Sequence, residues 1–231
     1  MNVATATRFA RQLALPEVGA DGQERLGAAR AVVVGDGLGA ETAARYLAAA
    51  GVGALRILSA GETWPHLDEA LRGSNPDVTI ERGPRPADGR AWMAALEGVA
   101  IVVRADLDDD ALLPAAIRRG VPLVVLRGQD GGDGAVDVVS FRKHGPCPHA
   151  PLDVPRVAAV PAPEGAARVV AGTAAAAEAL HVLVAHDVPA RAARARHLRV
   201  PLDGGDPVAQ DLPWTPECFA CGGSGSEMSF Q

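Results

Sequence analysis

The chain has 231 residues, of which 48% are hydrophobic and 22% are charged, a composition typical of one folded domain with at most a small appendage. Its formal net charge of −6 argues against a protein that binds nucleic acid without sequence preference. No unbroken apolar stretch reaches the roughly 20 residues of a membrane span, and the N-terminus, Met1 to Gln12, lacks the pattern of a secretory signal. Three cysteines cannot close a disulfide framework, so we expect reduced thiols and a cytoplasmic location.

The first clear elements are a strand, a glycine-rich turn, a helix and a second strand. Val32-Val33-Val34 is an apolar β-branched run of the kind found in buried parallel strands. The turn Gly35-Asp36-Gly37-Leu38-Gly39 follows it, and a helical stretch from about Ala40 to Ala50 then stops at Gly51. Leu55 to Leu58 is the next predicted strand. This order is the nucleotide-binding opening of a doubly wound fold.

The alternation of short apolar runs and helical stretches continues along the chain. It predicts strands at Val78–Ile80, Ala100–Val103 and Val121–Leu126, and helices at Arg90–Leu96, Asp110–Arg119 and Val169–His186. Val136–Phe141 alternates more weakly and is expected to be an antiparallel addition to the sheet. The chain after Val188 resembles loop, and Gly222–Gln231 resembles a disordered tail.

These elements predict an α/β fold with a doubly wound, mostly parallel sheet of the Rossmann-like class. We expect a helical N-terminal segment over residues 1–29, the α/β domain over 30–200, and a C-terminal extension over 201–231 that carries a cysteine pair. Gly172 and several alanines in the longest helix indicate a place where a neighbouring element approaches closely.

The spacing of Gly35, Gly37 and Gly39 is shorter than the usual G-x-G-x-x-G, and its place after a strand and before a helix is what indicates a ligand site. In a dinucleotide fold such glycines permit the tight turn, the approach of a phosphate and close packing of the helix. The alternative is a tight strand-to-helix turn with no ligand. A nicotinamide enzyme would place an acidic residue at the end of the second strand. That position holds Ser59, and Glu62 lies slightly beyond it. Ser59 either bonds a ribose hydroxyl weakly or caps the strand.

Motifs along nearly the whole chain resemble those of the ThiF/MoeB/HesA family, the bacterial relatives of ubiquitin-activating enzymes. Arg8-Phe9-Ala10-Arg11-Gln12 is similar to the family's R-[YF]-x-R-Q opening. The segment Leu47–Gly53 is similar to the family's L-x-x-[AS]-G-V-G. The glycine turn occupies the place of the family's Gly-rich loop. Further similar segments are Asp21–Leu26, Asn75-Pro76 and Gly120–Leu123.

The resemblance implies a protein that binds ATP·Mg²⁺ and adenylates the C-terminal glycine of a sulfur carrier, usually as a homodimer. Arg11 would then be the arginine offered across the dimer to the phosphates, and Gly35, Gly37 and Gly39 the phosphate loop. An aspartate after the fourth strand would hold magnesium, and Asp106 or Asp108 is the candidate. The alternative for these acids is a run at a helix N-terminus, which the helix dipole favours.

Three departures from the family pattern argue against catalysis. The glycine loop is one residue short, and Ser59 stands where the family has a ribose-binding aspartate. Only fifteen residues separate Ser59 from Asn75, which leaves no room for the family's crossover with its Asn, Arg and Lys. Lys143, the one lysine, is far away in sequence. Because adenylyl transfer depends on positioned cations and metal, we expect the usual mechanism to be lost.

The cysteines resemble the split zinc site of the family. Cys218-Phe219-Ala220-Cys221 is a C-x-x-C half-site, and Cys147-Pro148-His149-Ala150 has alanine where the second thiolate is expected. His149 could complete a tetrahedral structural site with Cys147, Cys218 and Cys221. The alternative is a decayed site with three free thiols.

Three functional hypotheses follow. The leading one is a degenerate ThiF-like protein that binds a partner, as a homodimer or paired with an active subunit, and that contacts a sulfur carrier or peptide. The second is a minimal ATP-dependent adenylyltransferase in which arginines replace the missing groups. The third is an NAD- or S-adenosylmethionine-dependent enzyme, with Glu62 on the ribose. None of them involves nucleic acid or a membrane.

Overall fold

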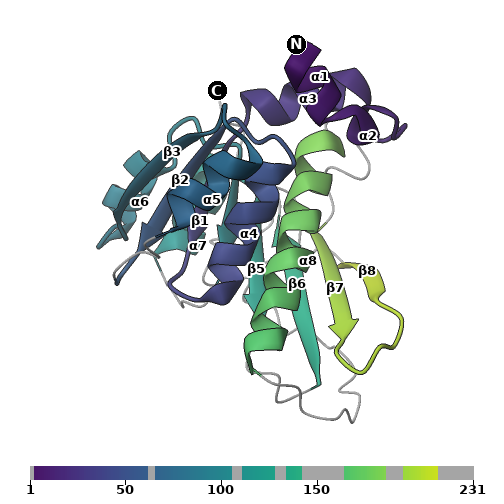
Figure 1. Cartoon of the computed structure of the whole chain (residues 1–231). Coiled ribbons are helices and arrows are strands. Elements are labelled where there is room, and N and C mark those ends of the chain that lie inside the picture. Colours follow the sequence, from purple (N-terminus) through teal and green to yellow (C-terminus); the bar gives the residue numbers. More distant parts are fainter. Residues whose placement is uncertain are drawn as a thin grey trace, which may run out of the picture.

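The fold is built around one eight-stranded sheet, in the order β3-β2-β1-β4-β5-β6-β7-β8 (Figure 1). The computed structural model describes residues 3–61, 66–105, 111–127, 134–141, 164–185 and 195–212. The order of the first five strands is that of a doubly wound nucleotide-binding fold. The predicted α/β class with a mostly parallel, Rossmann-like sheet is therefore confirmed.

The parallel half of the sheet forms from the apolar runs that the sequence indicates. Its strands, in sheet order, are β3 (Thr79–Pro84), β2 (Ala54–Ser59), β1 (Arg30–Val34), β4 (Ile101–Arg104) and β5 (Leu123–Arg127). All four of these pairings are parallel. Val32, Val33 and Val34 have no exposed surface, as expected for a central strand covered on both faces.

The other half is antiparallel, with β6 (Ala135–Phe141), β7 (Ala195–Pro201) and β8 (Val208–Leu212). The expected antiparallel addition at β6 is confirmed, whereas the expectation of loop after Val188 is wrong for β7 and β8. The inward positions of β7 include His197 and Arg199, which are 1% and 8% exposed and both bind Asp137 of β6. A strand whose buried face is charged hides the apolar alternation on which strand prediction depends.

Helices cover both faces of the parallel half. One face packs against α3 (Gly19–Ala28), α4 (Leu38–Ala49), α5 (Leu67–Ser74) and α8 (Glu164–Val184). The other face packs against α6 (Gly89–Ala95) and α7 (Leu112–Arg119), with Trp92 fully buried. The short helices α1 (Val3–Arg8) and α2 (Ala10–Leu13) lie beside α3, at one end of the molecule (Figure 1).

Helix α8 runs alongside α4, as Figure 1 shows. A Cβ added at Gly172 of α8 would lie 2.4 Å from the carbonyl oxygen of Gly39 in α4, so glycine is what permits this approach and the expected close contact is confirmed. By length and composition alone α8 is long and apolar enough to cross a membrane, although the sequence of this helix contains no unbroken apolar stretch of that length. Half of its apolar window is buried inside the protein, which is typical of a core helix.

Candidate nucleotide-binding turn

The first glycine of the turn is fixed by contact between neighbouring strand ends. Gly35 follows β1 with φ +153°, and its N–H donates to the carbonyl of Leu58 at 3.1 Å. A Cβ at this position would lie 2.1 Å from the carbonyl oxygen of Ala105, just after β4. Only glycine fits between the carboxyl ends of β1, β2 and β4, where ligands of this fold class bind.

The other two glycines open helix α4. Gly37 is the N-cap residue in an extended conformation, and no side chain caps the helix. Gly39 is buried in the first turn, and its carbonyl oxygen is the atom that Gly172 of α8 approaches closely. The N-terminus of a twelve-residue helix is therefore formed at the position where the fold presents backbone N–H groups to an anion.

An acid, Asp36, lies inside this turn, and no sequence motif predicts a role for it. Oδ1 of Asp36 accepts hydrogen bonds from the backbone N–H groups of Ala60 at 2.9 Å and Gly61 at 3.1 Å. Asp36 forms no ion pair with a cation among the residues that the structure describes. The structure thus brings a carboxylate to the end of β2, although the residue at that strand end is Ser59.

Ser59 bonds within its own turn. It is 6% exposed, and its Oγ donates to the carbonyl of Gly61 at 3.2 Å. Beyond the undescribed residues 62–65, the short interval before Asn75 is filled by α5, whose Leu67 and Leu71 are fully buried. This helix was not predicted, and it occupies most of the described part of the interval in which the family pattern expects a crossover.

Arg11 does not join the turn within one chain. Arg11 is exposed on α2, which packs beside α3. The end of α3 lies at the amino end of β2, where the N–H of Gly53 donates to the carbonyl of Leu26. Arg11 is therefore at the amino edge of the sheet. The glycine turn lies at the opposite, carboxyl edge of the sheet.

The remaining predicted site residues lie outside the described part of the chain. Asp106 comes immediately after Ala105, and its magnesium role stays a prediction. The same is true of the predicted zinc ligands Cys147, His149, Cys218 and Cys221. Within the described residues, no group of three or more His, Cys, Asp or Glu side chains could hold a metal ion.

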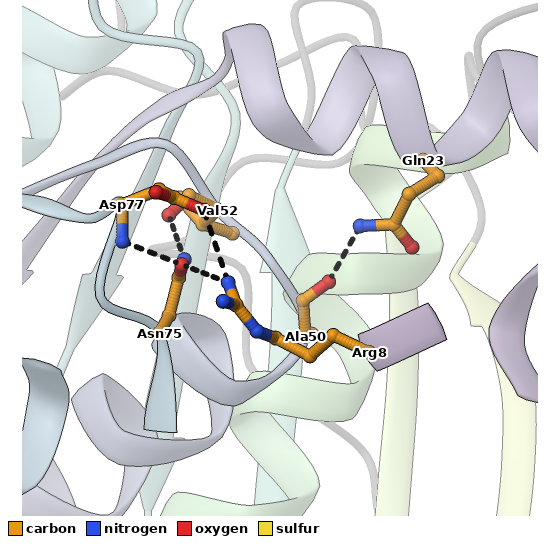
Figure 2. Close-up of polar contacts among 6 residues, drawn as sticks. All are labelled: Arg8, Gln23, Ala50, Val52, Asn75 and Asp77. Carbon is orange, nitrogen blue, oxygen red and sulfur yellow. Dashed lines mark hydrogen bonds and ion pairs between the residues drawn. The ribbon is translucent and has the colours of Figure 1, made fainter. Parts of the chain in front are cut away.

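Two of the resembling motifs meet in space, at the amino edge of the sheet. Arg8 NH1 donates to Asn75 Oδ1 at 3.2 Å and pairs with Asp77 at 3.0 Å, across more than sixty residues of sequence (Figure 2). Asn75, which is 3% exposed, also accepts from the N–H of Asp77. The opening motif is therefore anchored to the segment that precedes β3.

Comparison with known proteins gives a family match for the N-terminal part of the chain. The model of the ThiF family matches residues 9–59, from the opening motif through the glycine turn to the end of β2. The similarity to the ThiF family is carried by this segment. The "Probable adenylyltransferase/sulfurtransferase MoeZ" of Mycobacterium tuberculosis is 54% identical to this chain over 52 residues, which are 22% of the chain and 13% of that relative. The "Adenylyltransferase and sulfurtransferase MOCS3" of Bos taurus is 58% identical over 52 residues, which are 22% of the chain and 11% of the relative.

Solved structures extend the similarity of fold well beyond residue 59. E. coli MccB with MccA-N7isoASN has a TM-score of 0.69 at 15% identity, over 93% of this chain and 75% of that chain. The structure of PaaA has a TM-score of 0.69 at 14% identity, over 92% of this chain and 75% of that chain. E. coli MccB with ATP has a TM-score of 0.68 at 15% identity, over 93% of this chain and 74% of that chain. The sequence match is thus confined to about one fifth of the chain, whereas the fold is shared along most of it.

Proposed function

We propose that this chain is a partner-binding subunit that no longer adenylates a carboxyl terminus. The observation that carries the proposal is the Asp36 carboxylate, which bridges the glycine turn and the turn after β2. It brings negative charge to the edge of a site that must hold a polyphosphate. Like charges about 4 Å apart at a protein surface repel by roughly 1 to 4 kcal/mol.

The surroundings of the turn support the same conclusion. The described part of the interval between Ser59 and Asn75 holds α5 instead of a long crossover. Since adenylyl transfer is catalysed mainly by cations and metal held around the phosphates, a turn that lacks the Asn, Arg and Lys of that crossover is expected to bind weakly and to leave the chemistry uncatalysed.

A partner surface is available on the paired helices α4 and α8. Leu38 and Tyr46 of α4 are 44% and 51% exposed, and Val169 of α8 is 43% exposed. Exposed apolar side chains mark a protein–protein interface where they form a contiguous patch, and we propose that these three do so. The partner in this proposal is a second copy of the chain or an active ThiF-family subunit, and the complex would contact a sulfur carrier or peptide.

The test is ATP–pyrophosphate exchange by the purified chain with Mg²⁺, alongside an active adenylyltransferase as positive control. We expect no exchange above background, together with a stable dimer or heterodimer by light scattering that Leu38→Asp dissociates. Exchange by the chain alone would refute the loss of adenylation. A monomer with no copurifying subunit would refute the role in partner binding.

A second candidate, the minimal ATP-dependent adenylyltransferase, is favoured by arginines at the carboxyl edge of the sheet. Arg104 ends β4 and Arg127 ends β5, so these cations lie at the edge that carries the glycine turn. MccB, with the same fold, has been crystallised with ATP. If this function holds, pyrophosphate exchange occurs and Arg104→Gln lowers it at least tenfold.

We also propose that Cys147, His149, Cys218 and Cys221 hold a structural zinc ion. Three thiolates and one imidazole fit the tetrahedral preference of Zn²⁺ and leave no open position for water. Metal analysis should give one zinc per chain, and His149→Ala should lower that content. A preparation that is free of zinc after growth with added zinc would exclude the site.

A further inference from the structure

The sheet ends in two outermost strands, β3 and β8, and β3 carries the features that discourage pairing with another chain. Glu81 pairs with Arg56 at 3.3 Å. Arg82 donates to Asp68 at 2.7 Å, and Pro84 ends the strand. An outermost strand leaves a row of N–H and C=O groups to which a further strand can bond, and charged side chains and proline are the usual protection against it.

Strand β8 lacks this protection, although it lies outside β7 at the margin of the sheet (Figure 1). It contains no proline or lysine, and its one charged residue, Asp211, lies opposite Arg196 of β7. Residues 208–211 are all exposed, and Val208 leaves 58% of its surface in solvent. An outermost strand of this kind is a template on which another strand can form.

The sequence of β8 is complementary to itself in antiparallel register. When Gln210 is placed opposite its own copy, Val208 lies opposite Leu212 of the second copy, and Ala209 lies opposite Asp211. No carboxylate then faces another, and an apolar pair covers the exposed Val208. Val208, Gln210 and Leu212 point to one face of the strand. Leu212 already packs against the core on that face, so the new pair extends an existing apolar surface.

We propose that two copies of this chain pair through β8, antiparallel and about a two-fold axis at Gln210, so that their sheets become one continuous sheet. A two-fold axis makes the same five residues serve both copies. Because so short a strand buries little surface, the pairing is weak, with a dissociation constant of about 0.1 mM. The surface shares no residue with the proposed partner surface on α4 and α8, and the inference does not rest on the proposed function.

The first test is sedimentation equilibrium of the full chain with Leu38→Asp, so that the surface on α4 and α8 does not contribute. At protein concentrations up to about 1 mM, we expect a monomer–dimer equilibrium with the constant given above. Val208→Lys places an ammonium group on the pairing strand of each copy and should weaken the dimer at least tenfold. Leu15→Lys is the matched control, because Leu15 is also apolar and 49% exposed but lies outside β8, and it should leave the constant unchanged.

The second test locates the axis with Gln210→Cys. Directly opposite residues of antiparallel strands have Cα atoms about 4.5 to 5.5 Å apart, which a disulfide can span. Mild oxidation should therefore link residue 210 of one copy to residue 210 of the other, as identified by mass spectrometry of the peptides. Ala209→Cys lies one position away from the axis and should give at least tenfold less of the symmetric product.

Equal effects of Val208→Lys and Leu15→Lys, or equal yields of the symmetric disulfide from the two cysteine variants, would overturn the proposal. A disulfide from residue 210 to Cys218 or Cys221 of the same chain as the main product would also overturn it, because the chain would then cover its own outermost strand. Pyrophosphate exchange by the chain would refute the proposed function and leave the pairing of β8 intact, so the two failures are distinguishable.

Discussion

The two edges of the sheet differ in how their polar groups are satisfied. At the carboxyl edge, the Asp36 carboxylate is held by two backbone N–H groups and pairs with no cation among the described residues. At the amino edge, Arg8 neutralises Asp77 and also binds the buried Asn75 (Figure 2). The amino edge is thus a closed network that joins distant segments, whereas the carboxyl edge keeps the backbone of a ligand site and places an acid in it.

This difference teaches that packing alone can require a backbone that is also suited to a ligand site. Gly35 and Gly172 are required by close contacts with the carbonyl oxygens of Ala105 and Gly39, so packing alone is sufficient to demand them. Charged groups around a phosphate are under no such packing demand. The proposed loss of adenylation would therefore leave the glycine turn in place, because the packing of the fold still requires it.

The largest effect is expected from Gly35→Ala. The added Cβ would lie 2.1 Å from the Ala105 carbonyl oxygen, on a residue with φ +153°. Steric overlap and backbone strain together should lower the free energy of unfolding by about 3 kcal/mol or more, measured by urea denaturation. Gly73→Ala in α5, where no atom lies within 4 Å of the new Cβ, is the control and should be neutral or stabilising. Equal stability of the two variants would show that the turn is not held by this contact.

Much of the fold could be predicted because the parallel strands are apolar and regularly spaced along the chain. Strand β7 was missed because its inward side chains His197 and Arg199 are polar and are satisfied by Asp137, about sixty residues earlier. The partner that makes a buried charge tolerable is not visible in a local window of sequence.

The candidate site was predictable to the extent that it depends on local backbone. Glycine spacing indicated the turn after β1, but Asp36 was missed because its partners, Ala60 and Gly61, belong to the next strand end. A signal was present: in this fold β2 lies beside β1, so an acid in the first turn can reach the end of β2. The contact between Arg8 and Asn75 likewise required the three-dimensional arrangement, although both motifs had been singled out.

The amino edge provides the second prediction. Asn75→Ala removes the acceptor of the Arg8 and Asp77 N–H groups and the buried amide that bonds Val52 O. Loss of buried hydrogen bonds should cost about 2 kcal/mol of stability, again measured by urea denaturation. Asp77→Asn, whose side chain is 67% exposed, should cost less than about 1 kcal/mol. If the two variants are equally destabilised, the network is held by the surface ion pair rather than by Asn75.

The smallest effect, and the one most relevant to function, is expected from Asp36→Asn. The amide keeps an oxygen that can accept from Ala60 and Gly61 N–H, so the unfolding free energy should change by less than about 1 kcal/mol. Removal of the negative charge should raise the affinity for inorganic pyrophosphate about fivefold, since this corresponds to roughly 1 kcal/mol of relieved repulsion. Calorimetric titration measures the change, and Asp77→Asn at the opposite edge is the matched loss of one charge. If both variants gain the same affinity for pyrophosphate, the effect comes from the net charge of the protein rather than from the position of Asp36. If Asp36→Asn binds more weakly, the carboxylate assists the ligand, and the comparison between the two edges then favours a nucleotide site that is still in use.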